Sequence, residues 1–305
     1  MDPSAAATYP NEDNLVMLPS GRRLGYAEYG DPDGRPLIFL HGTPSTRVMF
    51  RLGDGAAKEA GVRLIAPDRP GLGLSDPDAN RTIPDFADDV ASLADRLSLG
   101  RFPLAGLSGG GPYAAACGAR LGGRLTALGL VSAMAPVASP AIRKHLTARY
   151  SVIFGLGRRS RLLTALGTKL FRRTFAKDPD RVMRFAMSAM TGPDRDMLAD
   201  DGTRRCLIAS AEDALSQGTS GLVTELALMS RAWGFEPSDI SVPTFLWHGE
   251  ADTVVPPAFG RWLAERIPDC RTRFIPGAGH FWIVANGAEV MRRLTGPAAG
   301  ANMNA

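Results

Sequence analysis

The serine in the sequence AGLSGG, at residues 105–110, has the surroundings of a catalytic nucleophile. An apolar segment precedes it and a run of small residues follows, which is typical of a buried strand that turns sharply into a helix. Such a turn brings backbone segments close together, so Gly106 and Gly110 on either side of Ser108 must lack side chains. We therefore predict that Ser108 stands at the corner with its hydroxyl open for attack, while the N–H of Gly109 points toward an anion beside it.

A serine hydroxyl needs a base to become nucleophilic, and the base needs a carboxylate to orient it. Of the four histidines, His280 lies on a loop just past the last predicted strand, where its side chain can reach across the top of a sheet. Asp252 follows another predicted strand in the same way, and it is preferred to Glu250 because a shorter side chain is easier to fix in place. His248 is expected to be packed or hydrogen-bonded in a turn. Serine, acid and base all follow the carboxyl ends of strands, where open parallel sheets place their sites.

Apolar runs of strand length alternate with helical patterns, which predicts an α/β fold with a mostly parallel sheet flanked by helices. The predicted strands are a hairpin of residues 15–18 and 23–29, followed by 37–40, 62–66, 102–107, 125–131, 242–247 and 272–275. The predicted helices between them cover residues 46–60, a segment that starts at Thr82, and residues 109–121. From 135 to 235 the pattern is helical throughout. We therefore expect a core made of residues 1–134 and 236–305, with an inserted helical cap at 135–235.

The helical cap should cover the site, because it is inserted in the chain between the serine and the acid. Two of its apolar stripes are Leu163, Leu166 and Leu170, and Leu222, Leu226 and Met229. We expect Met or Leu side chains of the cap to line an apolar pocket. Met183, Met187 and Met190 share a helical face, for which core packing is the expected role and pocket lining the alternative.

Positive charge is concentrated in the cap. Residues 138–177 contain ten Lys or Arg and no Asp or Glu, and subtracting these ten from the net charge of +4 leaves −6 for the remainder. The segment carries no nucleic-acid-binding motif, so no nucleic-acid partner is expected. We expect these side chains to form the solvated outer face of the cap, because burying an unpaired Arg is costly. Attraction to anionic substrates or to a membrane surface is the alternative.

The remaining composition indicates a cytoplasmic protein. The three cysteines, Cys117, Cys206 and Cys270, are scattered without C-x-x-C spacing, as expected of free buried thiols in a reducing compartment. Residues 1–14 are polar and have no apolar stretch typical of a signal peptide. No apolar run approaches the roughly 18 residues of a membrane helix, so no integral membrane segment is expected. The oligomeric state stays open.

Five separated motifs, taken in order, resemble those of the α/β-hydrolase superfamily over about residues 15 to 294. Besides the G-x-S-x-G segment they are HGTP at 41–44, DRPGLGLS at 68–75, WHGEAD at 247–252 and GAGH at 277–280. The resemblance implies the triad order serine, acid, histidine, and its spacing selects Asp252. It also implies an oxyanion hole formed by the N–H groups of Thr43 and Gly109. His41 then orders this loop, and the turn at 68–75 is structural.

Residues and resemblance together predict a serine hydrolase that cleaves a small to medium apolar ester through an acyl-enzyme, without a metal or organic cofactor. Ser108 attacks the acyl carbon, His280 takes and returns its proton, and Asp252 holds the imidazole. Haloalkane dehalogenases and soluble epoxide hydrolases use aspartate at the elbow, so neither is favoured. Proline iminopeptidases are another lidded relative, but the cap shows no clear acidic pair for a substrate amine, so an ester is preferred. Three alternatives stay open: perhydrolysis as in cofactor-free haloperoxidases, a carbon–carbon or hydroxynitrile lyase, and a ligand-binding receptor with little turnover.

Overall fold

Eight strands form one sheet in the order β1-β2-β4-β3-β5-β6-β7-β8. The computed structural model describes residues 9–296, so the first eight and last nine residues of the predicted core, with most of the polar N-terminal segment, lie outside it. The strands are β1 (Asn14–Met17), β2 (Arg23–Gly30), β3 (Arg35–Leu40), β4 (Val62–Pro67), β5 (Phe102–Leu107), β6 (Leu125–Val131), β7 (Thr244–Gly249) and β8 (Cys270–Ile275). β2 is antiparallel to both of its neighbours, β1 and β4, whereas all the other neighbouring pairs, from β4 and β3 to β7 and β8, are parallel. The predicted mostly parallel sheet is confirmed.

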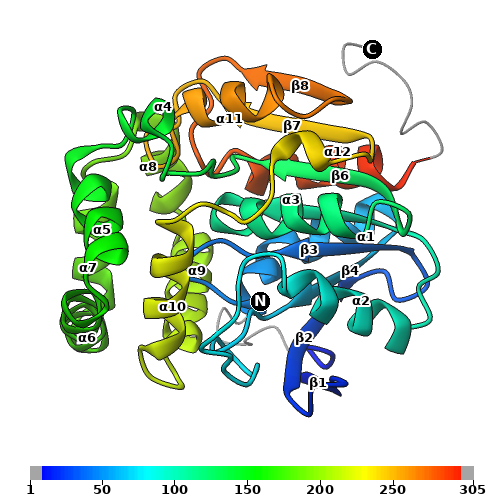
Figure 1. The fold of residues 1–305 in the computed structure, drawn as a ribbon, viewed down its shortest axis with the longest axis horizontal. Coiled ribbons are helices and arrows are strands. Elements are labelled where there is room, and N and C mark those ends of the chain that lie inside the picture. The colour runs from blue at the N-terminus through cyan, green and yellow to red at the C-terminus, as the bar shows by residue number, and fades with distance from the viewer. Residues whose placement is uncertain (1–8, 297–305) are drawn as a thin grey trace, which may run out of the picture.

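Helices cover both faces of the sheet (Figure 1). The helices of the core are η1 (Arg47–Gly53), α1 (Asp54–Ala60), α2 (Phe86–Arg96), η2 (Ser108–Gly110), α3 (Gly111–Arg120), η3 (Pro237–Asp239), α11 (Pro257–Ala264) and α12 (Ile283–Thr295). α2, α3 and α11 pack on one face, and α1 and α12 on the other. In β3, Ile38 and Leu40 join the first apolar cluster. Leu37 and Phe39 join the second, which explains the continuous apolar run in the sequence.

Two helices differ from their predicted bounds. The helix expected to start at Thr82 begins at Phe86, because the Asp85 carboxylate accepts the N–H of Thr82 at 2.8 Å and closes a turn before the helix. The helix expected over residues 46–60 is divided into the 3-10 helix η1 and α1. Asp54 begins α1, where a carboxylate in the first turn stabilises a new helix start.

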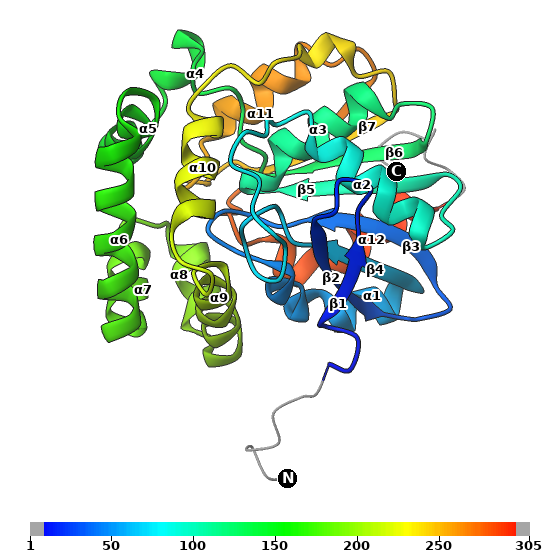
Figure 2. The same cartoon turned by 60° about the horizontal axis from the view of Figure 1, so that its bottom comes forward.

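Seven helices lie between β6 and β7, within the segment of residues 135–235 that we call the cap. They are α4 (Pro140–Arg143), α5 (Ala148–Arg159), α6 (Arg161–Lys177), α7 (Pro179–Met187), α8 (Gly192–Ala199), α9 (Asp201–Ala214) and α10 (Ser220–Met229). They stand together at one end of the sheet, and α6 is among those farthest from it (Figures 1 and 2). Phe175 of α6, Ile208 of α9 and Leu222 of α10 belong to a separate apolar cluster inside the cap.

The cysteines of the described residues form no disulfide, and two of the three are buried. All three cysteines are free, and Cys117 and Cys206 are buried as expected. Cys270 is only half-buried, because it begins β8 at the edge of the sheet. No described helix is long and apolar enough to span a membrane.

Candidate active site

Ser108 is the first residue of η2, directly after β5, and its φ of +55° lies in the left-handed region that a non-glycine residue rarely adopts. A Cβ on Gly106 would lie 2.5 Å from the carbonyl oxygen of Gly110, so this close approach requires glycine. The N–H of Met134 donates to the Ser108 carbonyl at 3.1 Å and ties the turn to the segment after β6. The side chain of Ser108 is partly exposed and lines a cavity.

His280 and Asp252 form a buried pair beside the same cavity. His280 Nδ1 donates to Asp252 Oδ2 at 2.7 Å, and the N–H groups of Val254 and Val255 both donate to Asp252 Oδ1 at 2.8 Å. These contacts fix the carboxylate and turn Nε2 of the imidazole away from it. His280 and Ser108 line one cavity, although no hydrogen bond joins them among the described residues. Such bonds often tighten only when substrate binds.

Burial and charge act in opposite directions on this pair. Burial alone would raise the pKa of Asp252, but His280 and its hydrogen bond, with a contribution from His248, hold that pKa well below its usual range. Burial alone would lower the pKa of His280, yet the Asp252 carboxylate raises it, with a smaller contribution from Asp194. Asp252 is therefore ionised at neutral pH, and His280 binds a proton more readily than a free histidine.

Two other titratable residues near Asp252 are held by different partners. Glu250 is exposed and pairs with Arg261 at 3.3 Å, away from the imidazole. His248 is buried, and its Nε2 donates to the carbonyl oxygen of Val255 at 2.8 Å. It lies at the end of β7 rather than in a turn, is hydrogen-bonded to the loop that follows, and its Nε2 is 3.5 Å from Asp252 Oδ2.

The loop after β3 brings Thr43 against the serine turn. A Cβ on Gly109 would lie 2.6 Å from Thr43 Oγ1 and 3.2 Å from its backbone nitrogen, so the two backbones are in direct contact. Neither the N–H of Thr43 nor that of Gly109 donates to another described residue. His41 is buried behind them, and its Nε2 accepts the N–H of Arg69 at 3.2 Å. Two N–H groups without acceptors beside a serine have the arrangement of an oxyanion hole.

A buried charge network, which the sequence analysis missed, holds this loop. Arg69 is fully buried and donates to Thr43 Oγ1 at 2.7 Å. Glu225 of α10 accepts hydrogen bonds from Arg69 at 2.9 Å and from Arg81 at 2.6 Å. It also accepts the hydroxyl of Tyr113 at 2.7 Å. The two guanidinium groups outweigh burial and lower the pKa of Glu225 to about 2, so a charged cap residue is held against the loop that carries Thr43. The available signal was a lone carboxylate within the apolar sequence GLVTELALM.

A second cap carboxylate holds the histidine loop. Asp194 of α8 is buried, and its two oxygens accept the N–H groups of His280 and Phe281, both at 2.8 Å. A Cβ on Gly279 would collide with this carboxylate, which explains the glycine directly before His280. The backbone of the predicted base is therefore positioned by the cap, and the sequence analysis did not anticipate this contact.

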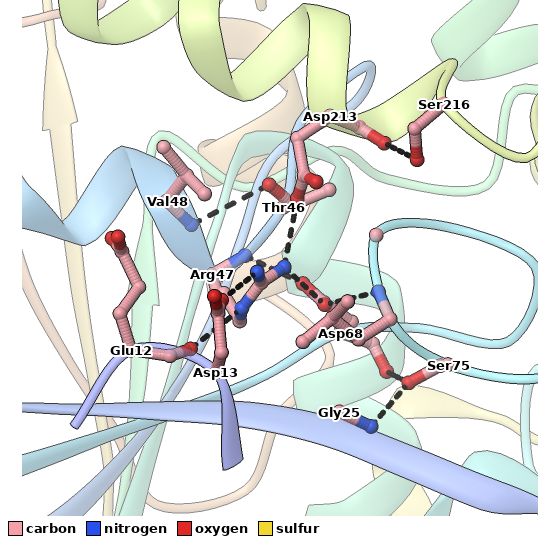
Figure 3. A network of polar contacts seen from close by, with 12 residues as sticks. Glu12, Asp13, Gly25, Thr46, Arg47, Val48, Asp68, Ser75, Asp213 and Ser216 are labelled. Carbon is pink, nitrogen blue, oxygen red and sulfur yellow. Dashed lines mark hydrogen bonds and ion pairs between the residues drawn. The ribbon is translucent and has the colours of Figure 1, made fainter. Parts of the chain in front are cut away.

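A third link joins the cap to the turn at residues 68–75 (Figure 3). Arg47 is buried and donates to Asp68 at 2.8 Å and to Asp213 of α9 at 2.7 Å. The other ligands of the Arg47 guanidinium are the side chain of Asp13 and the carbonyl oxygen of Glu12. Arg47 thus joins the turn to a cap helix, which is consistent with the structural role expected for that turn.

A cavity of about 440 Å³ lies between the core and the cap. Thr43, Ser108 and His280 line its core side. Its cap side is mainly apolar and includes Ile153, Phe154, Phe171, Met183, Leu226 and Met229. Met190 also lines the cavity and Met187 does not, so the alternative role of pocket lining applies to two of the three methionines. The expected shared helical face is wrong, because α7 ends at Met187 and Met190 lies in the turn that follows.

The ten basic residues of the segment 138–177 are all exposed. Among them Arg149 alone also lines the cavity, where its guanidinium lies 5.6 Å from the centroid of the Phe185 ring. Nine of these side chains are therefore exposed and away from the cavity, as expected for the outer face of the cap. The tenth, Arg149, contributes a cation to the cavity.

Comparison with known proteins places this geometry in a family. The model of the "Alpha/beta hydrolase family" matches residues 37–293. The chain is 28% identical over 255 residues to the AB hydrolase superfamily protein YisY of Bacillus subtilis, covering 81% of this chain and 85% of that protein. It is 34% identical to a non-heme chloroperoxidase of Streptomyces lividans over 130 residues, which are 40% of this chain and 45% of that protein.

Solved structures agree at the level of the fold. A thermophilic esterase from Thermogutta terrifontis is similar with a TM-score of 0.64 and 23% identity, over 92% of this chain and 95% of that one. Since the family model covers most of the chain, the assignment does not depend on this likeness. The chain belongs to the alpha/beta hydrolase family.

Proposed function

We propose that this protein is a carboxylesterase-type serine hydrolase that cleaves small to medium apolar esters through an acyl-enzyme. The observation that carries the proposal is the cavity wall, which holds Ser108 and His280 together. His280 is in turn hydrogen-bonded to the buried Asp252 at 2.7 Å. A nucleophile, a base and an orienting carboxylate in this relation are the parts that acyl transfer from an ester requires.

The first half-reaction forms the acyl-enzyme. Ser108 Oγ attacks the ester carbonyl carbon, and its proton passes to His280 Nε2. The negative charge that develops on the carbonyl oxygen is stabilised by the N–H groups of Thr43 and Gly109. Asp252 stabilises the imidazolium by charge. The carbon–oxygen bond to the alcohol then breaks, and the leaving alkoxide takes the proton from His280.

The second half-reaction releases the acid. Water loses a proton to His280 Nε2 while its oxygen attacks the acyl carbon, and the same N–H groups stabilise the second oxyanion. The bond to Ser108 Oγ breaks, and the proton returns from His280 to that oxygen. The enzyme is regenerated, and no cofactor enters the balance.

The preferred substrate follows from the cavity. Its volume of about 440 Å³ and its apolar cap side favour an apolar acyl or alcohol group of small to medium size. In this proposal residues 1–134 and 236–305 carry the triad, and the cap of residues 135–235 closes over it. The resemblance to a chloroperoxidase supports perhydrolysis as a second activity, in which hydrogen peroxide replaces water in the second half-reaction and yields a peracid.

A series of p-nitrophenyl esters from acetate to dodecanoate tests the proposal. We expect kcat/KM to rise from acetate to a medium chain and then to fall as the cavity is filled. Ser108→Ala should abolish turnover without changing the thermal unfolding temperature. The same assay with added hydrogen peroxide measures the formation of a peracid. A purified full-length protein that hydrolyses none of these esters, or a Ser108→Ala variant that hydrolyses them normally, would contradict the proposal.

A further inference from the structure

The outer face of α6 carries an exposed apolar stripe. Leu162, Leu166 and Leu170 follow one another at four-residue spacing and therefore share one side of the helix. Their exposed fractions lie between 54 and 70%. Val152 of α5 and Phe185 of α7, on the neighbouring cap helices, are also largely exposed. Most large apolar side chains of the described chain are buried, so this clustering on adjacent helices sets the surface apart.

Basic side chains surround the stripe. Lys169, Arg173 and Lys177 repeat at four-residue spacing on the same outer side of α6. They belong to the run of ten exposed Lys and Arg in residues 138–177, which contains no carboxylate. Within the part of the chain that the structure describes, none of the ten forms a salt bridge. We call the leucine stripe together with Lys169, Arg173 and Lys177 the basic face.

The basic face lies on the opposite side of α6 from the cavity. Thr164, Thr168 and Phe171 of the same helix line the cavity. α6 also stands at the outer edge of the molecule, away from the sheet (Figures 1 and 2). A flat surface can therefore approach this helix without obstruction from the core, and only one helix separates that surface from the cavity.

Charge decides which partner fits. A symmetric contact with a second copy of the chain would set the cations of one basic face against those of the other. An anionic bilayer satisfies both parts of the surface, because lipid phosphates attract Lys and Arg while leucine side chains reach the acyl boundary. We propose that the basic face of α6 docks the protein onto the surface of a bilayer that contains anionic lipids. This inference does not depend on the proposed ester hydrolysis.

Co-sedimentation of the full-length protein with vesicles tests the docking. The probes are vesicles of phosphatidylcholine alone and vesicles of phosphatidylcholine and phosphatidylglycerol in equal parts. We expect binding to the anionic vesicles at low salt, at least about tenfold weaker binding to the neutral ones, and partial release by salt.

Two triple variants separate the apolar from the ionic contribution. Lys169→Gln with Arg173→Gln and Lys177→Gln should weaken binding by about a hundredfold, because each cation near an anionic bilayer raises the affinity about fivefold. Leu162→Ser with Leu166→Ser and Leu170→Ser should weaken it by about tenfold, because less apolar area enters the interface. None of these six side chains lines the cavity, so hydrolysis of p-nitrophenyl acetate and the unfolding temperature should stay unchanged in both variants.

The matched control replaces exposed apolar side chains elsewhere. Leu15→Ser with Met17→Ser, on β1, changes comparably exposed residues and should leave vesicle binding unchanged. Equal binding to both kinds of vesicle, or normal binding by both triple variants, would overturn the proposal. It would also be overturned if the wild type were a dimer that the leucine variant converts to a monomer, since a second copy would then occupy the face.

Discussion

Replacing Asp194 by asparagine tests whether the cap holds His280, the proposed base, in place. The two carboxylate oxygens of Asp194 accept one N–H each from His280 and Phe281, at 2.8 Å, and the side chain is 1% exposed. Asparagine keeps one acceptor oxygen, but its NH₂ group would then face the second N–H. One charge-assisted hydrogen bond is lost, and a buried donor is left without a partner.

The size of the effect follows from that loss. A hydrogen bond to a charged group contributes about 1.5–3 kcal/mol. If the whole loss appears in the transition state, kcat/KM falls by about tenfold to a hundredfold, because each factor of ten corresponds to about 1.4 kcal/mol. The charge of Asp194 also raises the pKa of His280. Its removal should therefore move the acid limb of the pH profile of kcat/KM to lower pH, since the base is active when neutral.

The assay is the hydrolysis of p-nitrophenyl acetate across pH, together with thermal unfolding. Asp196→Asn, on the same helix and exposed, is the matched control and should leave kcat/KM and the pH profile unchanged. A variant at Asp194 that loses unfolding temperature but keeps both the rate and the acid limb would refute the positioning role. Unchanged values of all three quantities would refute the contact itself.

Three further outcomes are expected. Asp252→Asn should lower kcat by about a thousandfold or more. It should also shift the acid limb of the pH profile to lower pH, because the carboxylate that raises the pKa of His280 is removed. Glu250→Gln should change little, and reversed effects of the two variants would reassign the acid. Glu225→Gln should lower the free energy of unfolding in urea by about 3 kcal/mol or more, because two buried guanidinium groups lose their shared counter-charge. The control is Glu212→Gln, which changes an exposed carboxylate on α9, and a loss no larger than in this control would count against the network. Raising salt should change hydrolysis of neutral esters by less than about twofold, since screening acts on exposed charges; a strong loss would implicate Arg149 in binding them.

Local signals in the sequence were sufficient for the sheet and for the neighbourhood of Ser108. The central strands β3 to β7 are largely buried on both faces, so their apolar runs stand out, and the glycine at residue 106 is required by a backbone contact only four residues away. The carboxyl ends of parallel strands meet at one edge of the sheet, so Ser108, Asp252 and His280 could be predicted to lie close together although they are far apart in the sequence.

The contacts between the cap and the core could not be predicted from patterns in the sequence. Asp194 and His280 are 86 residues apart, and Glu225 and Arg69 are 156 apart, so no periodicity connects them. Side-chain orientation within the cap was equally hidden. The spacing of Leu166 and Leu170 shows that they share a helix face, but not that threonines would line the cavity while leucines meet solvent.

Covalent labelling of Ser108 tests the central claim most directly. A fluorophosphonate probe reacts with a serine only when a base and an oxyanion hole activate it. We expect stoichiometric labelling of the full-length protein, mass mapping of the label to Ser108, and loss of both labelling and ester hydrolysis in Ser108→Ala. Labelling of another residue with hydrolysis retained in Ser108→Ala, or an unlabelled wild type that still hydrolyses esters, would contradict the account.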